Sequence, residues 1–199
     1  MYRPPAFRAD DAEALRLIDE HPLAQLVVVA DGVPIATPVP LIRRGDSLVG
    51  HLARPNPVLR HPGNALALFT GADAYISPRW YANKPVDGKV VPTWNYVTVQ
   101  AHGPVEFFDD PERLLAAVTR LTMLHEGPRA RPWDVSDAPP DYIAAQLRGI
   151  VGLRIPITRI EGKRKMSQNR SEADRRGVAQ GLAESARPEE RLAASLIPT

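Results

Sequence analysis

Apolar and polar positions alternate with a period of two over much of the chain, and this pattern predicts half-buried strands. The strands predicted in this way cover 25–30, 35–42, 47–53, 65–70, 74–77, 96–102 and 153–158, with 104–108 continuing or pairing with the strand before it. Asp31-Gly32 lies between two apolar runs and predicts a tight hairpin. Short strands with close turns therefore dominate the chain.

Helical periodicity predicts a short helix that ends at His21-Pro22, an amphipathic helix over 111–125, a shorter helix over 141–148 and a C-terminal helical segment from Ser171. Asp10 and Asp110 each precede a predicted helix and can accept its first backbone bonds. Gly177 and Gly181 each weaken the C-terminal segment by about 1 kcal/mol relative to Ala. We expect the order of that segment to depend on packing.

Short strands with a few helices, and no alternation of strands and helices, indicate a mainly β fold that carries helices, either a barrel or a sandwich. We expect the main domain to cover 1–162 and a basic helical tail to cover 163–199.

Composition narrows the class of protein. The chain has 199 residues, of which 21 are Pro, and prolines spread along it exclude a long coiled coil or a continuous helical bundle. The absence of Cys excludes disulfides, thiolate metal sites and Cys nucleophiles. No apolar run approaches the ~20 residues of a membrane span. We expect a cytoplasmic protein without a membrane partner.

The net charge of +2 is unevenly distributed. The segment 163–176 holds six cations and two acids, so it carries +4 and the rest of the chain carries −2. A local basic patch suggests an anionic partner at one place, whereas a general affinity for nucleic acid needs a basic surface over the whole domain.

Pro38 and Pro40 are two positions apart on a predicted strand, so their missing N–H donors lie on the same side. We expect that side of the strand to lack a hydrogen-bonded neighbour and to face solvent or a ligand.

The sequence lacks the motifs of several common catalytic and binding sites. The five histidines show no metal-ligand spacing, and the chain has no Gly-x-Ser-x-Gly elbow and no phosphate-binding or dinucleotide fingerprint. We expect no metal site, and no catalytic residue can be assigned from motifs.

Two segments combine residue types that suit ligand binding. Residues 74–96 bring Trp and Tyr together with hydrogen-bonding side chains, as a planar heteroaromatic ligand requires, although a loop that packs its own aromatics would read the same way. Residues 163–170 set cations beside amide and hydroxyl donors, which suits a mononucleotide phosphate, a nucleic-acid backbone or a carboxylate at an interface.

Five motifs in order along the chain resemble the PaiB-type family of FMN-binding split-barrel proteins. They are Met1-Tyr2-x-Pro4-x-x-Phe7, His51-Leu52-Ala53-Arg54-x-Asn56-Pro57, Ala74-Tyr75-Ile76-Ser77-Pro78-x-Trp80-Tyr81, Val91-Pro92-Thr93-Trp94-Asn95-Tyr96 and Lys165-x-Ser167-Gln168-Asn169-Arg170. The resemblance implies a six-stranded split β-barrel, a homodimer with FMN between the subunits, and a negative transcriptional regulator of protease and sporulation genes.

The same resemblance implies the residues that bind FMN. Thr37, Pro38, Val39 and Pro40 would lie along the isoalloxazine ring, and His51, Leu52, Ala53, Arg54 and Asn56 near the ribityl chain and phosphate. Trp80, Tyr81, Lys84, Trp94 and Asn95 would line the pocket, with Lys165, Ser167, Gln168, Asn169 and Arg170 at its rim or on the partner subunit.

Three functions follow as alternatives. The first is an FMN-binding regulator, for which direct DNA binding has weak support because no helix-turn-helix is found. The second is a flavin-dependent oxidoreductase, in which His51 and Tyr81 are acid or base candidates by type and position. The third is a cofactor-free β-barrel interaction module in which Trp80 and Trp94 belong to the core.

Overall fold

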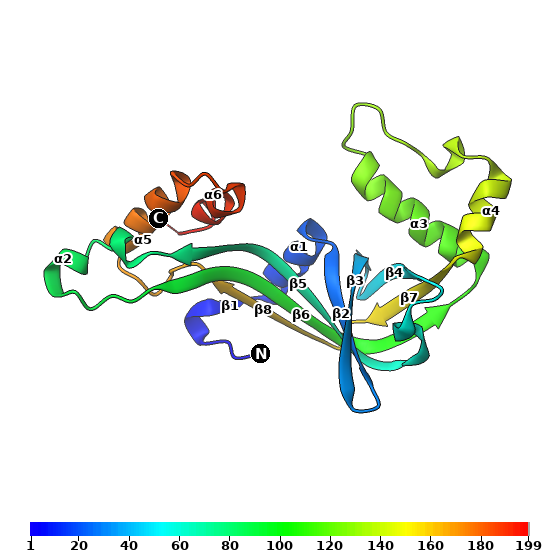
Figure 1. The fold of residues 1–199 in the computed structure, drawn as a ribbon, viewed down its shortest axis with the longest axis horizontal. Coiled ribbons are helices and arrows are strands. Elements are labelled where there is room, and N and C mark those ends of the chain that lie inside the picture. The colour runs from blue at the N-terminus through cyan, green and yellow to red at the C-terminus, as the bar shows by residue number, and fades with distance from the viewer. Residues whose placement is uncertain (199) are drawn as a thin grey trace. The chain divides into compact units, whose positions relative to one another are not determined.

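The computed structural model describes residues 1–198, with the backbone alone at position 87. The chain forms two compact units: unit 1 contains residues 1–17, 70–99 and 161–199, and unit 2 contains residues 18–69 and 100–160. Strands β5 (Gly63–Ile76), β6 (Thr93–Phe108) and β8 (Arg159–Lys165) run through both units (Figure 1). β8 continues across the boundary expected between 162 and 163, and residues 163–199 belong to unit 1.

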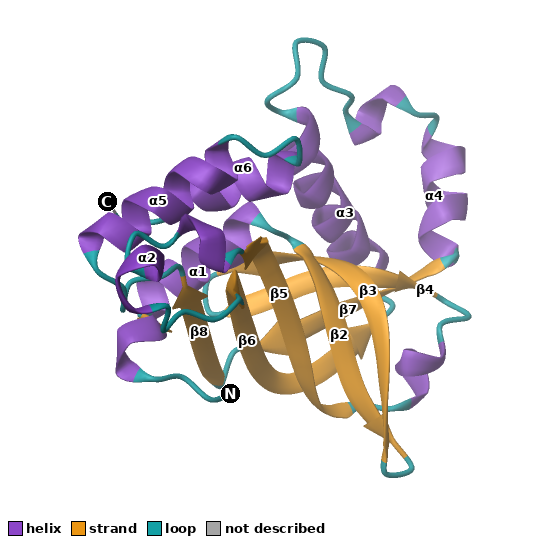
Figure 2. Ribbon diagram, turned by 60° about the vertical axis from the view of Figure 1, so that its left-hand side comes forward, coloured by secondary structure: helices purple, strands orange, loops and turns teal. Residues whose placement is uncertain are grey.

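Unit 2 is built on β2 (Leu23–Ala30), β3 (Val33–Arg44), β4 (Ser47–Ala53) and β7 (Ile150–Pro156), together with parts of β5 and β6. The sheet has the order β1-β8-β6-β5-β2-β3-β4-β7, and β6 also pairs with β7. This additional pairing joins Glu106–Phe108 to Gly152–Arg154 and closes the run from β6 to β7 into a ring, whose curved strands Figure 2 shows. The predicted mainly β fold with helices is confirmed.

The strands of unit 2 enclose an apolar core. Side chains with no exposed surface include Leu26, Val39, Leu41, Leu48, Leu153 and Ile155. At Gly103 in β6, an added Cβ would lie 1.9 Å from the carbonyl oxygen of Pro156. Because glycine has no Cβ, β6 can approach the end of β7 at this position, and any other residue type would keep the two strands further apart.

Three of the predicted helices form here, and the first two begin where their caps indicate. They are α1 (Asp11–Glu20), α3 (Pro111–Glu126) and α4 (Pro140–Arg148), with α2 (Lys84–Asp87) as a single turn. Oδ1 of Asp10 accepts the backbone N–H of Glu13 at 2.7 Å, and Oδ1 of Asp110 accepts that of Arg113 at 2.8 Å. Short 3-10 turns cover Pro5–Phe7, Pro57–Arg60, Pro78–Trp80 and Val135–Asp137.

Unit 1 packs the helices α5 (Glu172–Ala183) and α6 (Pro188–Ser195) on one face of its strands. Its core contains Ala72, Ala74, Ile76, Tyr81, Val178, Leu182, Ala193 and Ile197. An added Cβ at Gly177 would lie 2.1 Å from the Trp80 carbonyl oxygen, and one at Gly181 would lie 2.4 Å from Trp80 Nε1. The glycines that weaken α5 are thus the positions where Trp80 packs against it.

One predicted break in a strand is wrong. The segments 65–70 and 74–77 form the single strand β5, because the inward-facing set shifts from Ala65, Ala67 and Phe69 to Ala72, Ala74 and Ile76 as the strand leaves one core and enters the other. Of the two alternatives for 104–108, continuation is confirmed, because 96–102 and 104–108 form the single strand β6. β8 was not predicted, since its charged sequence, Arg159-Ile-Glu-Gly-Lys-Arg-Lys165, hides the alternation.

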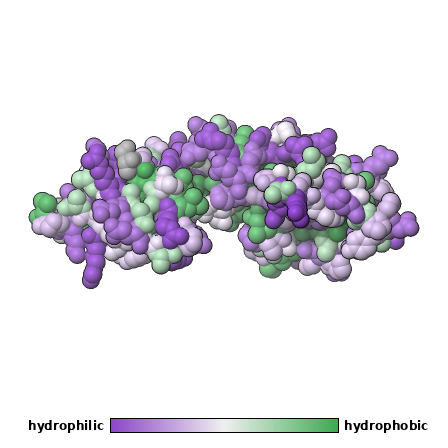
Figure 3. Space-filling model, turned by 90° about the horizontal axis from the view of Figure 1, so that it is seen from above, coloured by the Kyte–Doolittle hydropathy of each residue, from purple (hydrophilic) through white to green (hydrophobic). Residues whose placement is uncertain are grey.

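The surface of the described residues mixes polar and apolar side chains. On the face drawn in Figure 3, hydrophobic residues (green) lie among hydrophilic ones (purple). No helix in residues 1–198 has the length and hydrophobicity needed to cross a membrane.

Candidate functional site

The residues expected to bind a ligand form two clusters, one in each unit. The β3 cluster of unit 2 comprises Thr37, Pro38, Val39, Pro40, His51, Leu52, Ala53, Arg54 and Asn56. The β8 cluster of unit 1 comprises Trp80, Tyr81, Lys84, Trp94, Asn95, Lys165, Ser167, Gln168, Asn169 and Arg170.

In the β3 cluster, one side of β3 is open. β3 pairs with β2 along Val33–Pro40, but its pairing with β4 covers only Leu41–Arg44, so within the described residues Thr37–Pro40 has a neighbour on one side alone. Pro38 and Pro40 are exposed, whereas Val39 is fully buried in the barrel core. The predicted one-sided strand is confirmed, and a flat ligand can lie along it without competing with a ladder.

Asn56 fixes the chain beside this open edge. Its Oδ1 accepts the Val58 backbone N–H at 3.0 Å and caps the turn Pro57–Arg60, while its Nδ2 donates to Thr37 Oγ1 at 3.2 Å. The structure thus brings Thr37 and Asn56 together from segments about twenty positions apart, and both keep further hydrogen-bonding capacity for a ligand.

His51 lies on β4 opposite Gly152 and leaves a polar atom without a partner. Its Nδ1 is buried and has no hydrogen bond within the described residues. Burial lowers the pKa of the imidazole, so the ring is neutral near pH 7. Because a buried polar atom without a partner is costly, this nitrogen is suited to a hydrogen bond with a bound molecule.

The other members of the β3 cluster contribute less. Leu52 is 5% exposed and belongs to the core, so its side chain is not available to a ligand. Arg54 already donates to the carbonyl oxygens of Arg148 and Ile150, at 2.8 and 2.9 Å, and pairs with Asp109 at 2.9 Å. Arg54 therefore holds the junction between α4 and β7, a role that the sequence did not predict.

In the β8 cluster, Asn95 and Ser167 shape the loop after β8. Both are buried, and Asn95 Nδ2 donates to Ser167 Oγ at 3.0 Å. Ser167 has a φ of 61°, in the left-handed region. Gln168 accepts the Met166 backbone N–H and donates to the Arg164 carbonyl oxygen, both at 2.6 Å. Ser167 and Gln168 thus hold the loop together, while Asn169 stays exposed.

Lysines and aromatic rings alternate over one face of β8 and its neighbour β6. Lys163 Nζ lies 5.1 Å from the centroid of the Tyr96 ring and 5.7 Å from that of Tyr2. Lys165 Nζ lies 5.9 Å from the Tyr96 centroid and donates to the Trp94 carbonyl oxygen at 2.6 Å and to Thr93 Oγ1. Desolvation lowers the pKa of Lys165, against the effect of Tyr96, which raises it.

Exposed rings continue this face. Trp94 is 49% exposed and meets Tyr75 edge to face at 6.1 Å between ring centroids. Trp94 is therefore a surface residue and not core, and its indole face is open to stacking.

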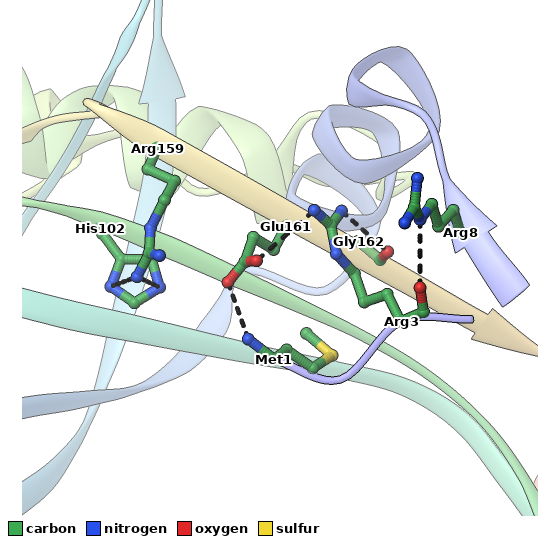
Figure 4. Close-up of polar contacts among 7 residues, drawn as sticks. All are labelled: Met1, Arg3, Arg8, His102, Arg159, Glu161 and Gly162. Atoms are coloured by element: carbon green, nitrogen blue, oxygen red, sulfur yellow. Dashed lines mark hydrogen bonds and ion pairs between the residues drawn. The ribbon is translucent and has the colours of Figure 1, made fainter. Parts of the chain in front are cut away.

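The N-terminal segment is fastened to the same strand. The Met1 ammonium pairs with Glu161 at 3.0 Å, and Arg3 contacts both Glu161 and the Gly162 carbonyl oxygen at 3.5 Å (Figure 4). The first motif, Met1-Tyr2-x-Pro4, thus has a structural role, because it supports β8 and places Tyr2 beside Lys163.

Tyr81 forms the buried end of the β8 cluster. It is 2% exposed, its hydroxyl has no partner within the described residues, and the Arg170 guanidinium lies 4.7 Å from the ring centroid. Asn83, two positions after Tyr81, donates its backbone N–H and its side-chain Nδ2 to the buried carboxylate of Asp174, both at 3.1 Å. From the sequence, Asp174 is only an acidic residue in the first turn of a predicted helix, so its contact with Asn83 was not predicted.

Two further residues of the β8 cluster, Trp80 and Lys84, lie on and beside the helices. Trp80 packs against Gly177 and Gly181 of α5 and is a structural residue. Lys84 is exposed at the start of α2.

Residues 1–159 match the family model described as "Putative FMN-binding domain". The chain belongs to the PaiB-type FMN-binding family. Its relative in Bacillus subtilis strain 168, "Protease synthase and sporulation protein PAI 2", is 32% identical over 207 residues, which cover 99% of this chain and 96% of that protein. An uncharacterized protein of Aspergillus fumigatus is 36% identical over 171 residues, which cover 68% of this chain and 66% of that protein.

A solved structure agrees with the fold of this PaiB-type chain. The FAD and heme binding protein of Mycobacterium smegmatis superimposes with a TM-score of 0.56 at 22% identity, over 80% of this chain and 73% of that one. Family membership assigns FMN as the cofactor, which decides against the cofactor-free module.

The described residues of this PaiB-type chain fit that cofactor. A flavin presents a planar ring with a hydrogen-bonding edge, a polyhydroxyl chain and a phosphate. In unit 2, the open edge of β3 suits the ring and the unpartnered Nδ1 of His51 suits a polar edge. In unit 1, taken by itself, the exposed Trp94 suits stacking. Lys163 and Lys165, which pair with no carboxylate within the described residues, suit the phosphate.

Proposed function

We propose that this chain binds FMN as a homodimer with the flavin at the subunit interface, and that it acts as a negative regulator of transcription of the PaiB type. The observation that carries the proposal is the open edge of β3 beside the unpartnered His51 nitrogen. The ring of strands from β6 to β7 is the six-stranded split barrel in this proposal, and one subunit supplies the β3 cluster while its partner supplies the β8 cluster.

The proposed regulator does not read DNA through its basic segment. Carboxylates already pair with two of the six cations of that segment, Arg164 with Glu13 and Arg176 with Glu172, so at most four charges remain for phosphates. Few free cations mean few phosphate contacts, and hence weak and salt-sensitive DNA binding. We therefore propose that regulation is indirect, through the flavin or through a protein partner.

A titration tests the flavin part of this proposal. Purified protein is incubated with FMN, freed of unbound flavin by gel filtration, and examined by visible absorption and light scattering. We expect a yellow protein with one flavin per chain and the mass of a dimer. A yellow monomer would refute the shared site while leaving flavin binding intact.

A mobility-shift titration at physiological salt tests the regulatory part. We expect no sequence preference for DNA upstream of genes that respond to this protein. A specific shift would show direct repression and refute the indirect route.

A flavin-dependent oxidoreductase is the second candidate function, and the buried hydroxyl of Tyr81 favours it. A buried hydroxyl without a partner is expensive in a purely structural site, but it can hold or pass a proton once a ligand meets it. FMN, when bound, supplies the hydride chemistry, and Tyr81 and His51 would orient groups or move protons. Consumption of NADH or NADPH by the FMN-loaded protein, reduced at least tenfold in Tyr81→Phe, would support this candidate.

A further inference from the structure

Two adjoining cavities in unit 2 lie apart from every residue of the β3 cluster. One, of about 450 Å³, is lined by Ile42, Arg44, Asp46, Ser47, Val49, Glu106, Phe108, Arg113, Ala116, Ala117, Arg120 and Arg154. The other, a groove of about 930 Å³, lies along α3 and shares Ile42, Arg44, Ala116 and Arg120 with the first. Both volumes fall in the range of small-molecule sites.

The polar cavity carries an excess of positive charge. Arg44, Arg113, Arg120 and Arg154 face Asp46 and Glu106, so the lining has a net charge of +2. Glu106 is already neutralised, since it pairs with Arg113 at 2.8 Å and with Arg154 at 3.7 Å. Asp46 accepts the hydroxyl of buried Ser47 at 3.1 Å. The carboxylates are thus occupied.

Arg44 and Arg120 are the two guanidinium groups of this lining to which no contact is assigned in the described chain. They stand where the cavity and the groove meet. The neighbouring Arg43 differs, because Asp19 binds it through both oxygens, at 3.1 and 2.6 Å. Two uncommitted guanidinium groups at one place suit a single anionic head group.

The groove beside them is apolar. α3 exposes Leu115, Met123 and Leu124 along it, at 39%, 61% and 45%, and Leu41 and Ile42 form its floor. Large exposed apolar side chains gathered in one groove mark a binding surface more often than an ordinary exterior. Besides Arg44 and Arg120, its charged members are Asp19 and Arg43, which neutralise each other, and Glu112, so the groove keeps a net charge of +1.

We propose that this groove binds a single-chain amphiphilic carboxylate of the fatty-acid class, with its head between Arg44 and Arg120 and its chain along Leu115, Met123 and Leu124. The charge excess at the junction selects an anion, and the adjoining apolar groove selects one with a hydrocarbon tail. This site goes beyond the proposed flavin function and shares no residue with either flavin cluster.

Calorimetric titration of the full chain with octanoate tests the proposal, with acetate and 1-octanol as controls that lack the tail or the charge. We expect one octanoate per chain, and binding at least tenfold weaker for both controls. Equal binding of 1-octanol would overturn the role of the arginines, and equal binding of acetate would overturn that of the groove. The titration is repeated with FMN-saturated protein, where we expect the same affinity, so that its result does not depend on flavin binding.

Variants separate this site from general electrostatics. Arg44→Gln/Arg120→Gln should weaken octanoate binding about tenfold or more. The matched control Arg131→Gln/Arg148→Gln removes the same charge from exposed positions that line neither cavity, and it should stay within about twofold of the parent. A similar loss in both double variants would overturn the assignment.

Met123→Glu tests the tail position, because it places a negative charge in the groove at an exposed residue whose replacement leaves the core intact. We expect it to abolish octanoate binding, whereas Met123→Leu should retain it. If octanoate fails to bind the parent and Met123→Glu instead converts a dimer to a monomer, a second copy of the chain covers the groove and the proposal is wrong.

Discussion

The contact between Trp80 and α5 decides whether a methyl group added at Gly181 raises or lowers the stability of the protein. Gly181 lies in the interior of a helix, where Ala is favoured over Gly by about 1 kcal/mol. An added Cβ there would lie 2.4 Å from Nε1 of Trp80 and 2.5 Å from both Cδ1 and Cε2. Overpacking of this kind costs about 1–3 kcal/mol. Gly181→Ala should therefore leave stability unchanged or lower it by up to about 2 kcal/mol.

Removing the indole should reverse that outcome. Trp80→Val deletes the three indole atoms that the new methyl group would meet, so Gly181→Ala in this background should stabilise by about 1 kcal/mol through helix propensity. The double-mutant cycle should then give a coupling energy of about 1–3 kcal/mol.

Urea unfolding followed by far-ultraviolet circular dichroism measures all four proteins of the cycle. Gln180→Ala, an exposed change on the same helix, is the control and should shift the free energy of unfolding by no more than about 0.5 kcal/mol. Equal stabilisation by Gly181→Ala with and without Trp80 would refute the packing of Trp80 on α5.

Three further predictions concern the barrel and the two clusters. Gly103→Ala should lower the free energy of unfolding by about 1–3 kcal/mol in urea, because its Cβ would lie 1.9 Å from the Pro156 carbonyl oxygen; Gly149→Ala, whose nearest atom is at 3.3 Å, is the control. Asn95→Ala should cost about 1–3 kcal/mol in the same assay, since it leaves buried Ser167 without its partner, and an unchanged stability would contradict that bond. Burial lowers the pKa of folded His51 below its ordinary value of 6.5, so the unfolded state binds the proton first as the pH falls. The free energy of unfolding should therefore fall as the pH drops through 6.5, and His51→Gln should flatten this dependence. An unchanged slope in the variant would show that another group causes it.

Local signals in the sequence predict much of this fold because they act over a few residues. The caps at Asp10 and Asp110 lie where their helices begin, and the spacing of Pro38 and Pro40 predicts the open side of β3. These features depend on backbone donors and dihedral limits, which each residue carries wherever it lies.

What the sequence does not reveal depends on partners that are distant in the chain. The role of Arg54 follows from the carbonyl oxygens of Arg148 and Ile150, nearly a hundred positions away, which no local pattern indicates. β8 is charged because its Glu161 and Lys163 meet the N-terminal segment, so its side chains do not alternate as a strand's usually do. The continuity of β5 through Gly71 was missed because the strand changes core there.

The same distinction holds for the candidate site. Residue types pointed to the aromatic and basic segments, and the resemblance supplied their cofactor. Only the structure separates Trp94, whose ring is exposed, from Trp80, which packs on α5. Only the structure shows that carboxylates pair with Arg164 and Arg176 of the basic segment, which agrees with the weak support that the sequence gives to direct DNA binding.

Flavin binding can be measured through the visible absorption spectrum of purified protein after incubation with FMN and removal of free flavin. We expect flavin absorption at one FMN per chain, together with a clear loss of bound flavin in His51→Ala, which removes the ring that bears the unpartnered nitrogen. A protein that stays colourless, or a His51→Ala variant that retains all of its flavin, would contradict this expectation.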